Sequence, residues 1–127
     1  MPTIVVADED RTSREALVAR LRRLFAQARV VAVRDLESDV VAREADVVLA
    51  RLAVAERFCR AGSPADVPVV ALTDEMSPDT LLRAETLGIA GAVRAPAGAE
   101  QLAAVIGPLL GAPPRDHRWA RERFRGR

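Results

Sequence analysis

The chain has no lysine, one cysteine and no long apolar run, and each absence excludes a class of protein. All 19 basic residues are arginine, so no mechanism can depend on a lysine amine. The single cysteine, Cys59, cannot form an internal disulfide or a metal cluster, and we expect a small core residue rather than a redox sensor. No apolar run approaches the roughly 20 residues of a membrane span, and no basic signal-peptide region precedes the first apolar run. We therefore expect a cytoplasmic protein with no membrane partner.

The charges that are present are distributed unevenly along the chain. Residues 1–112 carry 13 arginines against 16 acidic residues, a net charge of −3, whereas residues 113–127 carry 6 arginines against 2, a net charge of +4. The formal net charge of +1 thus hides an acidic part followed by a basic one. A length of 127 residues suits a single domain with its own core. We predict one domain over 1–112 and a proline-led, arginine-rich tail over 113–127.

Short β-branched runs alternate with segments whose apolar residues recur at helical spacing, which predicts strands and helices in turn. The predicted strands are 3–7, 30–33, 46–52, 67–72 and 91–94. The predicted helices are 12–27, 37–44, 54–61, 77–87 and 99–110. Strict alternation of this kind favours a three-layer α/β/α sandwich around a doubly wound parallel sheet.

Local signals define the ends of two of these helices. Thr12 or Ser13 is expected to cap the helix over 12–27. Ser77 and Pro78 are expected to open the helix over 77–87, which should stop just before a glycine. The expected buried face of the first helix consists of Ala16, Leu17, Leu21, Leu24 and Phe25.

Polar side chains follow three of the predicted strands at their carboxyl ends. Asp8, Glu9 and Asp10 follow the first strand, Arg51 lies at the end of the third, and Thr73 follows the fourth. Ligand and catalytic groups of parallel α/β sheets lie just past these ends, so we expect the side chains to converge. Adjacent carboxylates can hold a hard cation such as Mg²⁺, and a threonine hydroxyl can donate to a phosphoryl oxygen.

Four segments, in this order, resemble the receiver domain of bacterial response regulators. IVVADED (4–10) looks like the start of that domain, and DVVLA (46–50) like the strand that ends in the phospho-acceptor aspartate. ALT (71–73) resembles the segment with the switch threonine, and GIAGAVRAP (88–96) the fifth strand and its Lys-Pro end. The resemblance covers nearly all of the predicted domain. It implies a flavodoxin-like fold with five parallel strands and a role in two-component or phosphorelay signal transduction.

The sequence departs from the receiver pattern at positions that carry its chemistry. Arg51 stands at the phospho-acceptor position, Ala95 at the lysine before proline, and Ala92 at the aromatic switch position. The segment between Arg51 and Thr73 is also several residues shorter. An arginine offers only hydrogen-bond donors and cannot accept a phosphoryl group. The resemblance therefore implies a receiver fold without receiver chemistry, a pseudo-receiver that is not an enzyme.

The acidic cluster of Asp8, Glu9 and Asp10 has two interpretations. It is either a remnant metal site or an acidic group that Arg51 neutralises in place of the metal ion. We favour the second, because a guanidinium binds a carboxylate through two parallel hydrogen bonds and buried acids without a countercharge are costly. This hypothesis predicts that the Mg²⁺ site is lost and that no cofactor is needed. We expect Thr73 to be an ordinary strand-end hydroxyl or turn cap rather than a working switch.

The expected function is phosphorylation-independent signalling through protein contact. Candidate partners are a sensor histidine kinase, another response regulator, or a second copy of the chain in a homodimer. The resemblance points to the surface of the last two helices and the fifth strand, although a plain solvated face is an equal alternative. The interface candidates there are Leu81, Arg83, Glu85, Ala92 and Glu100.

The basic tail supports a different function, a nucleic-acid-associated transcriptional regulator. Arginines neutralise phosphates, and aromatic side chains stack on bases. The candidate contacts are Arg115, Arg118, Trp119, Arg121, Arg123, Phe124 and Arg125. The tail could instead dock on an acidic partner or on the chain's own acidic domain, or be a solvated terminus. An enzyme of a related fold, such as a phosphatase, is disfavoured because the chain lacks a cysteine nucleophile loop and the acceptor aspartate.

Overall fold

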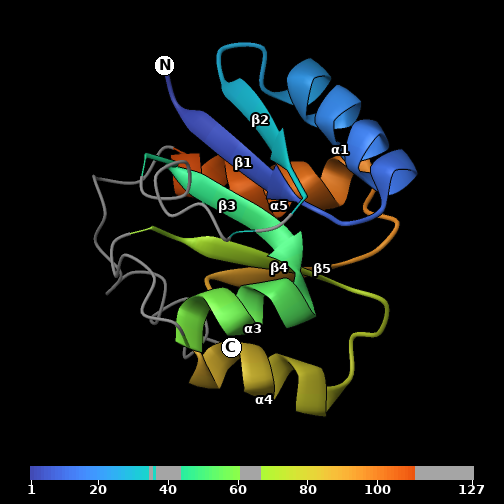
Figure 1. The fold of residues 1–127 in the computed structure, drawn as a ribbon, viewed down its shortest axis with the longest axis vertical. Coiled ribbons are helices and arrows are strands. Elements are labelled where there is room, and N and C mark those ends of the chain that lie inside the picture. The colour runs from blue at the N-terminus through green and yellow to red at the C-terminus, as the bar shows by residue number, and fades with distance from the viewer. Residues whose placement is uncertain (35, 37–43, 61–66, 111–127) are drawn as a thin grey trace.

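Five parallel strands form one sheet in the spatial order β2-β1-β3-β4-β5 (Figure 1). The structure, a computed structural model, describes residues 1–34, 36, 44–60 and 67–110. The strands are β1 (Thr3–Ala7), β2 (Arg29–Val33), β3 (Val47–Arg51), β4 (Val69–Thr73) and β5 (Gly91–Arg94). The helices are α1 (Arg11–Leu24), α3 (Leu52–Arg60), α4 (Pro78–Thr86) and α5 (Ala99–Leu110). The predicted helix over 37–44, apart from its last residue, and the tail over 113–127 lie outside the described residues.

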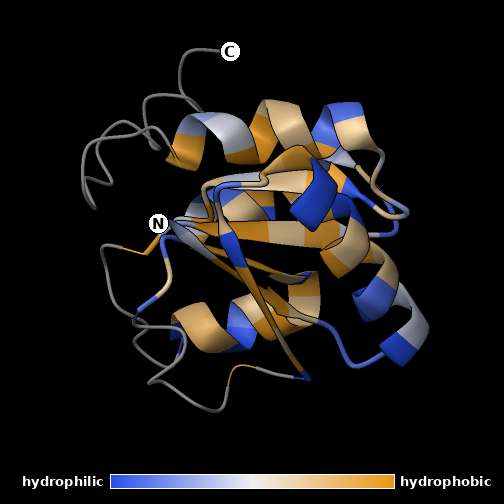
Figure 2. Ribbon diagram, turned by 90° about the horizontal axis from the view of Figure 1, so that it is seen from above, coloured by the Kyte–Doolittle hydropathy of each residue, from blue (hydrophilic) through white to orange (hydrophobic). Residues whose placement is uncertain are grey.

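The strand order is that of flavodoxin-like sheets, which confirms the predicted fold class. Helices α1 and α5 cover one face of the sheet, and α3 and α4 cover the other (Figure 1). Strands of such a sheet are apolar on both faces, because helices cover each side. Figure 2 shows the apolar strands between the two helical layers, whose helices carry both hydrophilic and hydrophobic residues. Among the described residues, no helix is both long and apolar enough to cross a membrane.

Strand β3 lies at the centre of the sheet, between β1 and β4. Its first four residues are fully buried, and Val48 pairs with Val5 on one side and Val69 on the other. Alternate side chains of the strands face opposite layers, so Leu49 packs with the α1 and α5 cluster while Val48 packs with the α3 and α4 cluster. Arg51, the last residue of β3, leaves the core at the carboxyl edge.

Helix α1 begins one residue earlier than predicted and ends three residues earlier. Its N-cap is Asp10, whose carboxylate accepts a hydrogen bond from the Thr12 N–H at 3.1 Å, so the prediction of Thr12 or Ser13 as cap was wrong. Aspartate caps as well as serine does, and here it lies nearer to β1. The expected buried face was also partly wrong, because Ala16 is exposed and Val18 is buried.

Helix α4 has the ends that the sequence predicts. The Ser77 hydroxyl accepts from the Thr80 N–H at 3.2 Å, and Pro78 is the first helical residue, where its missing N–H costs no hydrogen bond. Gly88 follows the C-cap with a φ of +76°, a left-handed conformation that favours glycine. These caps fix where α4 begins and ends in the segment between β4 and β5.

Candidate functional site

The carboxyl ends of β1, β3 and β4 lie side by side because these strands are neighbours in the sheet. Ala7 pairs with Ala50, and Arg51 pairs with Leu72, so the residues that follow β1 and β4 flank Arg51. The sequence predicted this convergence at the edge of the sheet. The contacts made there differ in part from those expected.

Asp8 is the buried acid of this edge, with 2% of its surface exposed. Its Oδ1 accepts a hydrogen bond from the Asp10 N–H at 3.0 Å. Its Oδ2 is buried without a hydrogen-bond partner among the described residues, and lies 3.5 Å from Nε of Arg51. A buried carboxylate oxygen is stable only near a donor or an opposite charge, and the guanidinium supplies that charge.

Arg51 spans three segments with one guanidinium. Besides the Nε contact to Asp8, Nη1 donates to Oδ1 of Asp74 at 3.2 Å, and Nη2 donates to the Ser13 hydroxyl at 3.3 Å. The Arg51 side chain is 30% exposed and Asp74 is 90% exposed, so the Asp74 pair is largely solvated. Arg51 therefore connects the end of β1, the first turn of α1 and the connection between β4 and α4.

The sequence predicted that Arg51 neutralises Asp8, Glu9 and Asp10, and this prediction is wrong for Glu9 and Asp10. Glu9 is exposed and Asp10 caps α1, and among the described residues the ion pairs of Arg51 are to Asp8 and Asp74. The extra acid, Asp74, directly follows β4 on the strand next to β3. Its place after Thr73 is the signal that could have identified it.

Thr73 is buried at the end of β4, and its hydroxyl is used within its own turn. The Oγ1 donates to the Glu75 carbonyl oxygen at 2.8 Å and accepts from the Glu75 N–H at 3.2 Å. This is the arrangement of a turn cap, in which a hydroxyl bonds to the backbone two residues on. It holds the start of the segment that carries Asp74.

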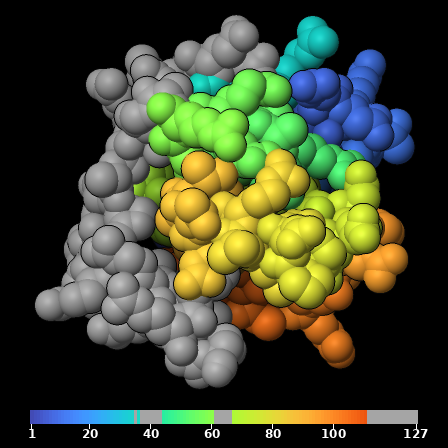
Figure 3. Space-filling view, turned by 90° about the horizontal axis from the view of Figure 1, so that it is seen from below, coloured from blue at the N-terminus to red at the C-terminus, as the bar shows by residue number. Residues whose placement is uncertain are grey.

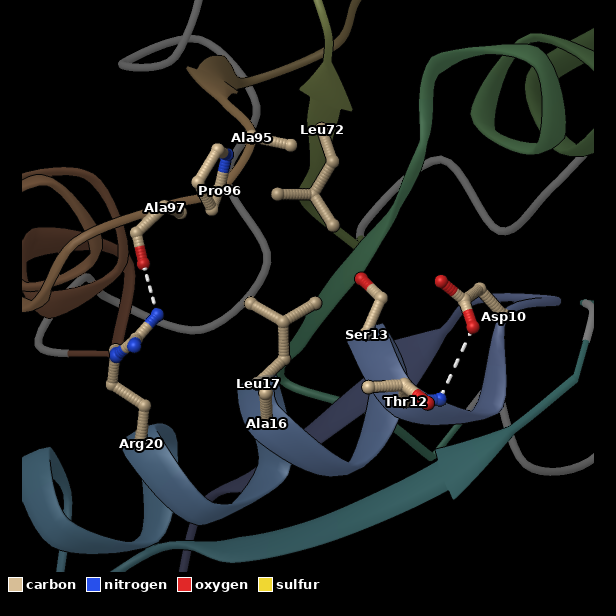
Figure 4. Close-up of a pocket in the computed structure, with 10 residues that line it drawn as sticks. All are labelled: Asp10, Thr12, Ser13, Ala16, Leu17, Arg20, Leu72, Ala95, Pro96 and Ala97. Carbon is tan, nitrogen blue, oxygen red and sulfur yellow. Dashed lines mark hydrogen bonds between the residues drawn. The ribbon is translucent and has the colours of Figure 1, made fainter.

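Ala95 follows β5 and lines a cavity of about 270 Å³ between α1 and the connection from β5 to α5 (Figure 4). The cavity lies beside the Arg51 cluster, since Ser13 belongs to both. Ala92, at the predicted switch position, is half-buried and packs against the α3 and α4 cluster. Sequence reasoning placed Ala95 at this edge but gave no sign of a cavity.

A second charge cluster, which sequence reasoning missed, joins α3 to α4. Glu56 is 7% exposed on α3, and its two carboxylate oxygens accept hydrogen bonds from Nε and Nη2 of Arg83 on α4. Arg60 adds a longer contact at 3.7 Å. Arg83, an interface candidate, therefore has an intramolecular partner although its side chain is 55% exposed.

The remaining interface candidates on the helices lie at the surface. Leu81, Glu85 and Glu100 are exposed, and Leu82, which was not singled out, is 62% exposed. Figure 3 shows the face on which α3 and α4 meet the solvent. A single exposed leucine is common on protein surfaces, but several together form an apolar patch. Leu81 and Leu82 of α4 and Met76 of the β4–α4 connection are all exposed.

No family model matches the chain, and no curated protein matches it in sequence. Its similarity to known proteins lies in solved structures. A protein of Burkholderia pseudomallei K96243 described as pilus assembly-related superposes with a TM-score of 0.76 at 20% identity, covering 91% of this chain and 95% of that one. The signal receiver domain of a DNA-binding response regulator (merR) of Colwellia psychrerythraea 34H gives 0.73 at 20% identity, covering 88% and 100%.

A third similar structure, described as the pilus assembly protein cpaE of Burkholderia thailandensis E264, gives a TM-score of 0.64 at 20% identity and covers 88% of this chain and 100% of that one. Identities this low establish the fold alone. The chain has the fold of response-regulator receiver domains, with five parallel strands and flanking helices.

The receiver fold implies a Mg²⁺ ion beside the phospho-acceptor, but the residues present do not fit one. Mg²⁺ needs carboxylate and other oxygens around an octahedron. One oxygen of Asp8 accepts a backbone hydrogen bond, the other faces the Arg51 cation, and the Asp10 carboxylate caps α1. Within the described residues, no three His, Cys, Asp or Glu side chains are grouped so that they could hold a metal ion.

Proposed function

We propose that this chain is a receiver-like signalling domain that acts without phosphorylation, through contact with another protein. The observation that carries the proposal is the position of Arg51, which stands at the end of β3 and faces the buried Asp8 carboxylate. A guanidinium has no lone pair that can attack phosphorus and stays charged. The side chain at this place serves as a countercharge rather than as a phosphoryl acceptor.

Fixed contacts replace the phosphoryl-dependent ones in this proposal. A receiver is a two-state element that phosphorylation biases. Here Arg51 bonds to Ser13 of α1 and faces Asp8, with a more solvated contact to Asp74, and Arg83 joins α4 to Glu56. Any bias between two states must then come from a partner or a ligand. Without either, the domain acts as a constitutive adaptor.

The proposed contact surface lies on α4 and α5. Leu81 and Leu82 supply exposed apolar area, and Glu85 and Glu100 supply negative charge. Aromatic and apolar anchors carry most interface energy, whereas charges at the rim set the choice of partner. The proposed partners are a sensor kinase, another response regulator or a second copy of this chain. The pilus assembly descriptions of two similar structures add an assembly protein to the partners worth testing.

The phosphoryl-acceptor half of the proposal is tested by incubating the protein with acetyl phosphate and Mg²⁺ and measuring its intact mass. A receiver domain that retains its acceptor aspartate serves as the positive control. We expect no adduct of roughly 80 Da, the mass of a phosphoryl group. A stoichiometric adduct that forms at the rate of the control would overturn the proposal.

The contact half is tested by light scattering of the pure chain and by pull-down, in which the parent is compared with a Leu82→Glu variant. The substitution puts a charge in the exposed apolar part of α4 without touching the core. We expect it to abolish self-association or partner capture. Retention of both by the variant would remove α4 from the proposed surface.

The alternative, a nucleic-acid-associated regulator, depends on the +4 charge and aromatic residues of the tail. That tail lies outside the described residues. Binding through it would weaken steeply as salt is added and would disappear when the chain is cut after Pro114. Binding to DNA or RNA that survives this truncation would move the contact to the domain itself.

A further inference from the structure

We propose that the cavity between α1 and the β5–α5 connection is a binding site for a small amphipathic organic anion. The cavity measures about 270 Å³ and lies at the carboxyl edge of the sheet (Figure 4). Its lining combines a continuous apolar wall with polar groups at its two ends. The binding proposal rests on this lining and does not depend on the proposed signalling function.

The apolar wall comes from three separate elements. Leu17 of α1 and Leu72 of β4 face each other across the cavity, and Pro96 and Ala97 close it from the β5–α5 connection (Figure 4). Leu17, Leu72 and Ala97 are at most 5% exposed, so they are part of the core and hold the wall in place. Ala95 contributes only a methyl group, which leaves the space between these elements open.

The polar groups lie at opposite ends of the wall. At one end Arg20 donates from Nη1 to the Ala97 carbonyl oxygen, and its guanidinium has no other hydrogen-bond partner among the described residues. That fixed, half-buried cation is suited to an anionic group, such as a carboxylate. At the other end the Ser13 hydroxyl points toward the cavity from the first turn of α1, with the Asp10 carboxylate beyond it (Figure 4).

The volume sets the size of the ligand. Pockets for drug-sized molecules measure about 300–1,000 Å³, so this one suits a molecule of one or two rings. The apolar body would lie on Leu17, Leu72 and Ala97, with its anionic group toward Arg20 and away from Asp10. A ligand of this size is expected to bind with a Kd between about 10 µM and 1 mM.

The cavity is connected to the Arg51 cluster through one side chain. Ser13 lines the cavity, and its hydroxyl accepts a hydrogen bond from Arg51, which also pairs with Asp74. A ligand whose apolar end packs against Ser13 would change this hydrogen bond and hence the contact of Arg51 with the β4–α4 connection. This second step rests on the proposed function, because it gives the signalling domain a ligand input in place of phosphorylation.

Binding is tested with ¹⁵N-labelled full-length protein and two probes, 2-naphthoate and its neutral analogue naphthalene-2-carboxamide. We expect 2-naphthoate to shift the amide resonances of Ser13, Leu17, Arg20 and Ala97 in a saturable manner, and the carboxamide to bind more weakly. Shifts that are scattered over the surface, or that do not saturate in the millimolar range, would overturn the proposal.

Variants that block the cavity distinguish specific binding from nonspecific adsorption to the protein surface. Ala95→Leu fills the cavity and should abolish the shifts, whereas Ala103→Leu on the exposed side of α5 should leave them unchanged. If Ala95→Leu loses its dispersed spectrum, Ala16→Phe blocks the cavity from its exposed rim on α1. Shifts that persist in a folded blocking variant would refute the site.

The role of Arg20 is tested by charge removal. Arg20→Gln should weaken 2-naphthoate binding about 5- to 10-fold and leave carboxamide binding nearly unchanged. Arg23→Gln, an exposed arginine on the same helix outside the cavity, is the matched control. Equal losses for both probes, or for both variants, would show that Arg20 does not select the anion.

The link to Arg51 has its own measurement. Saturation with 2-naphthoate should also shift the amides of Asp74 and Glu75, which do not line the cavity. Arg51→Met, at a residue that does not line the cavity either, should remove that remote shift while binding persists. Binding without the remote shift would refute the link and leave the phosphorylation-independent function standing. Formation of a phosphoryl adduct with acetyl phosphate would refute that function but would not affect the proposed binding site.

Discussion

Arg83 on α4 donates hydrogen bonds to both carboxylate oxygens of Glu56, a buried side chain on α3. The two residues are 27 positions apart in the chain, and their pairing joins the helices that cover one face of the sheet. A buried acid with a largely exposed arginine partner is an asymmetric pair. Removing the arginine leaves the buried carboxylate without its main partner. Removing the acid leaves an arginine that water can solvate.

We therefore expect Arg83→Gln to destabilise the domain by about 1–2 kcal/mol and Glu56→Gln by about 1 kcal/mol or less. The expected loss is small because Arg83 is 55% exposed and Arg60 retains a contact to Glu56. Urea unfolding of the two single variants and the double variant measures the coupling between them. Strictly additive effects would show that the pair contributes nothing to stability.

Loss of the Arg51 side chain should destabilise the domain because Asp8 would remain buried without a countercharge. We expect Arg51→Met to lower the free energy of unfolding by about 1–3 kcal/mol, because the partial exposure of Arg51 weakens the ion pair. Adding Asp8→Asn should recover part of that loss. Arg57→Met, an exposed residue on α3, is the control and should stay within about 0.5 kcal/mol of the parent. No recovery in the double variant would contradict the ion pair.

Placing an acid at the end of β3 should create a dependence on divalent cations. Arg51→Asp puts a third carboxylate beside Asp8 and Asp74, so its thermal midpoint should fall without Mg²⁺ and rise as MgCl₂ is added. The parent and Arg51→Asn should not respond in this way. The recovery is expected to be partial, because Asp74 is 90% exposed and its carboxylate is largely solvated. An equal response of the parent would show that the guanidinium does not exclude the ion.

Gly91 and Gly107 should respond to alanine with opposite signs. A Cβ at Gly91 would lie 2.8 Å from Cγ1 of Val105, whose χ1 is restricted in a helix, so Gly91→Ala should cost about 1–3 kcal/mol. A Cβ at Gly107, within α5, meets nothing within 4 Å, and Gly107→Ala should stabilise the helix by up to about 0.5 kcal/mol, because the following Pro108 offsets part of the gain in helix propensity. Denaturant unfolding of both variants checks the pair, and equal signs would contradict the packing of α5 on β5.

The fold was predictable because its signals are local. Strand and helix identity follows from the spacing of apolar residues, and the ends of α4 follow from Ser77, Pro78 and Gly88. The start of α1 was misplaced because three good capping residues, Asp10, Thr12 and Ser13, lie within four positions. Only the direction of the chain as it leaves β1 decides among them.

The candidate site was predictable only where strand order determines it. Arg51 and Asp8 meet because β1 and β3 are neighbours, and that pairing follows from the fold. Arg51 pairs with Asp74 rather than Asp10, and Glu56 pairs with Arg83. Both contacts depend on the packing of loops and helices that are distant in sequence. No periodicity encodes such contacts, nor does any pattern indicate the cavity beside Ala95.

The position of Arg51 has a consequence for how the edge of the sheet responds to its surroundings. A dissociable counter-ion stabilises a protein in proportion to its occupancy, so its effect varies with concentration and is lost to a chelator. The guanidinium that faces Asp8 belongs to Arg51, the last residue of β3, so it is covalently attached and cannot be diluted or exchanged. The charge balance of this edge is therefore set by the covalent chain and does not depend on the concentration of an ion in solution.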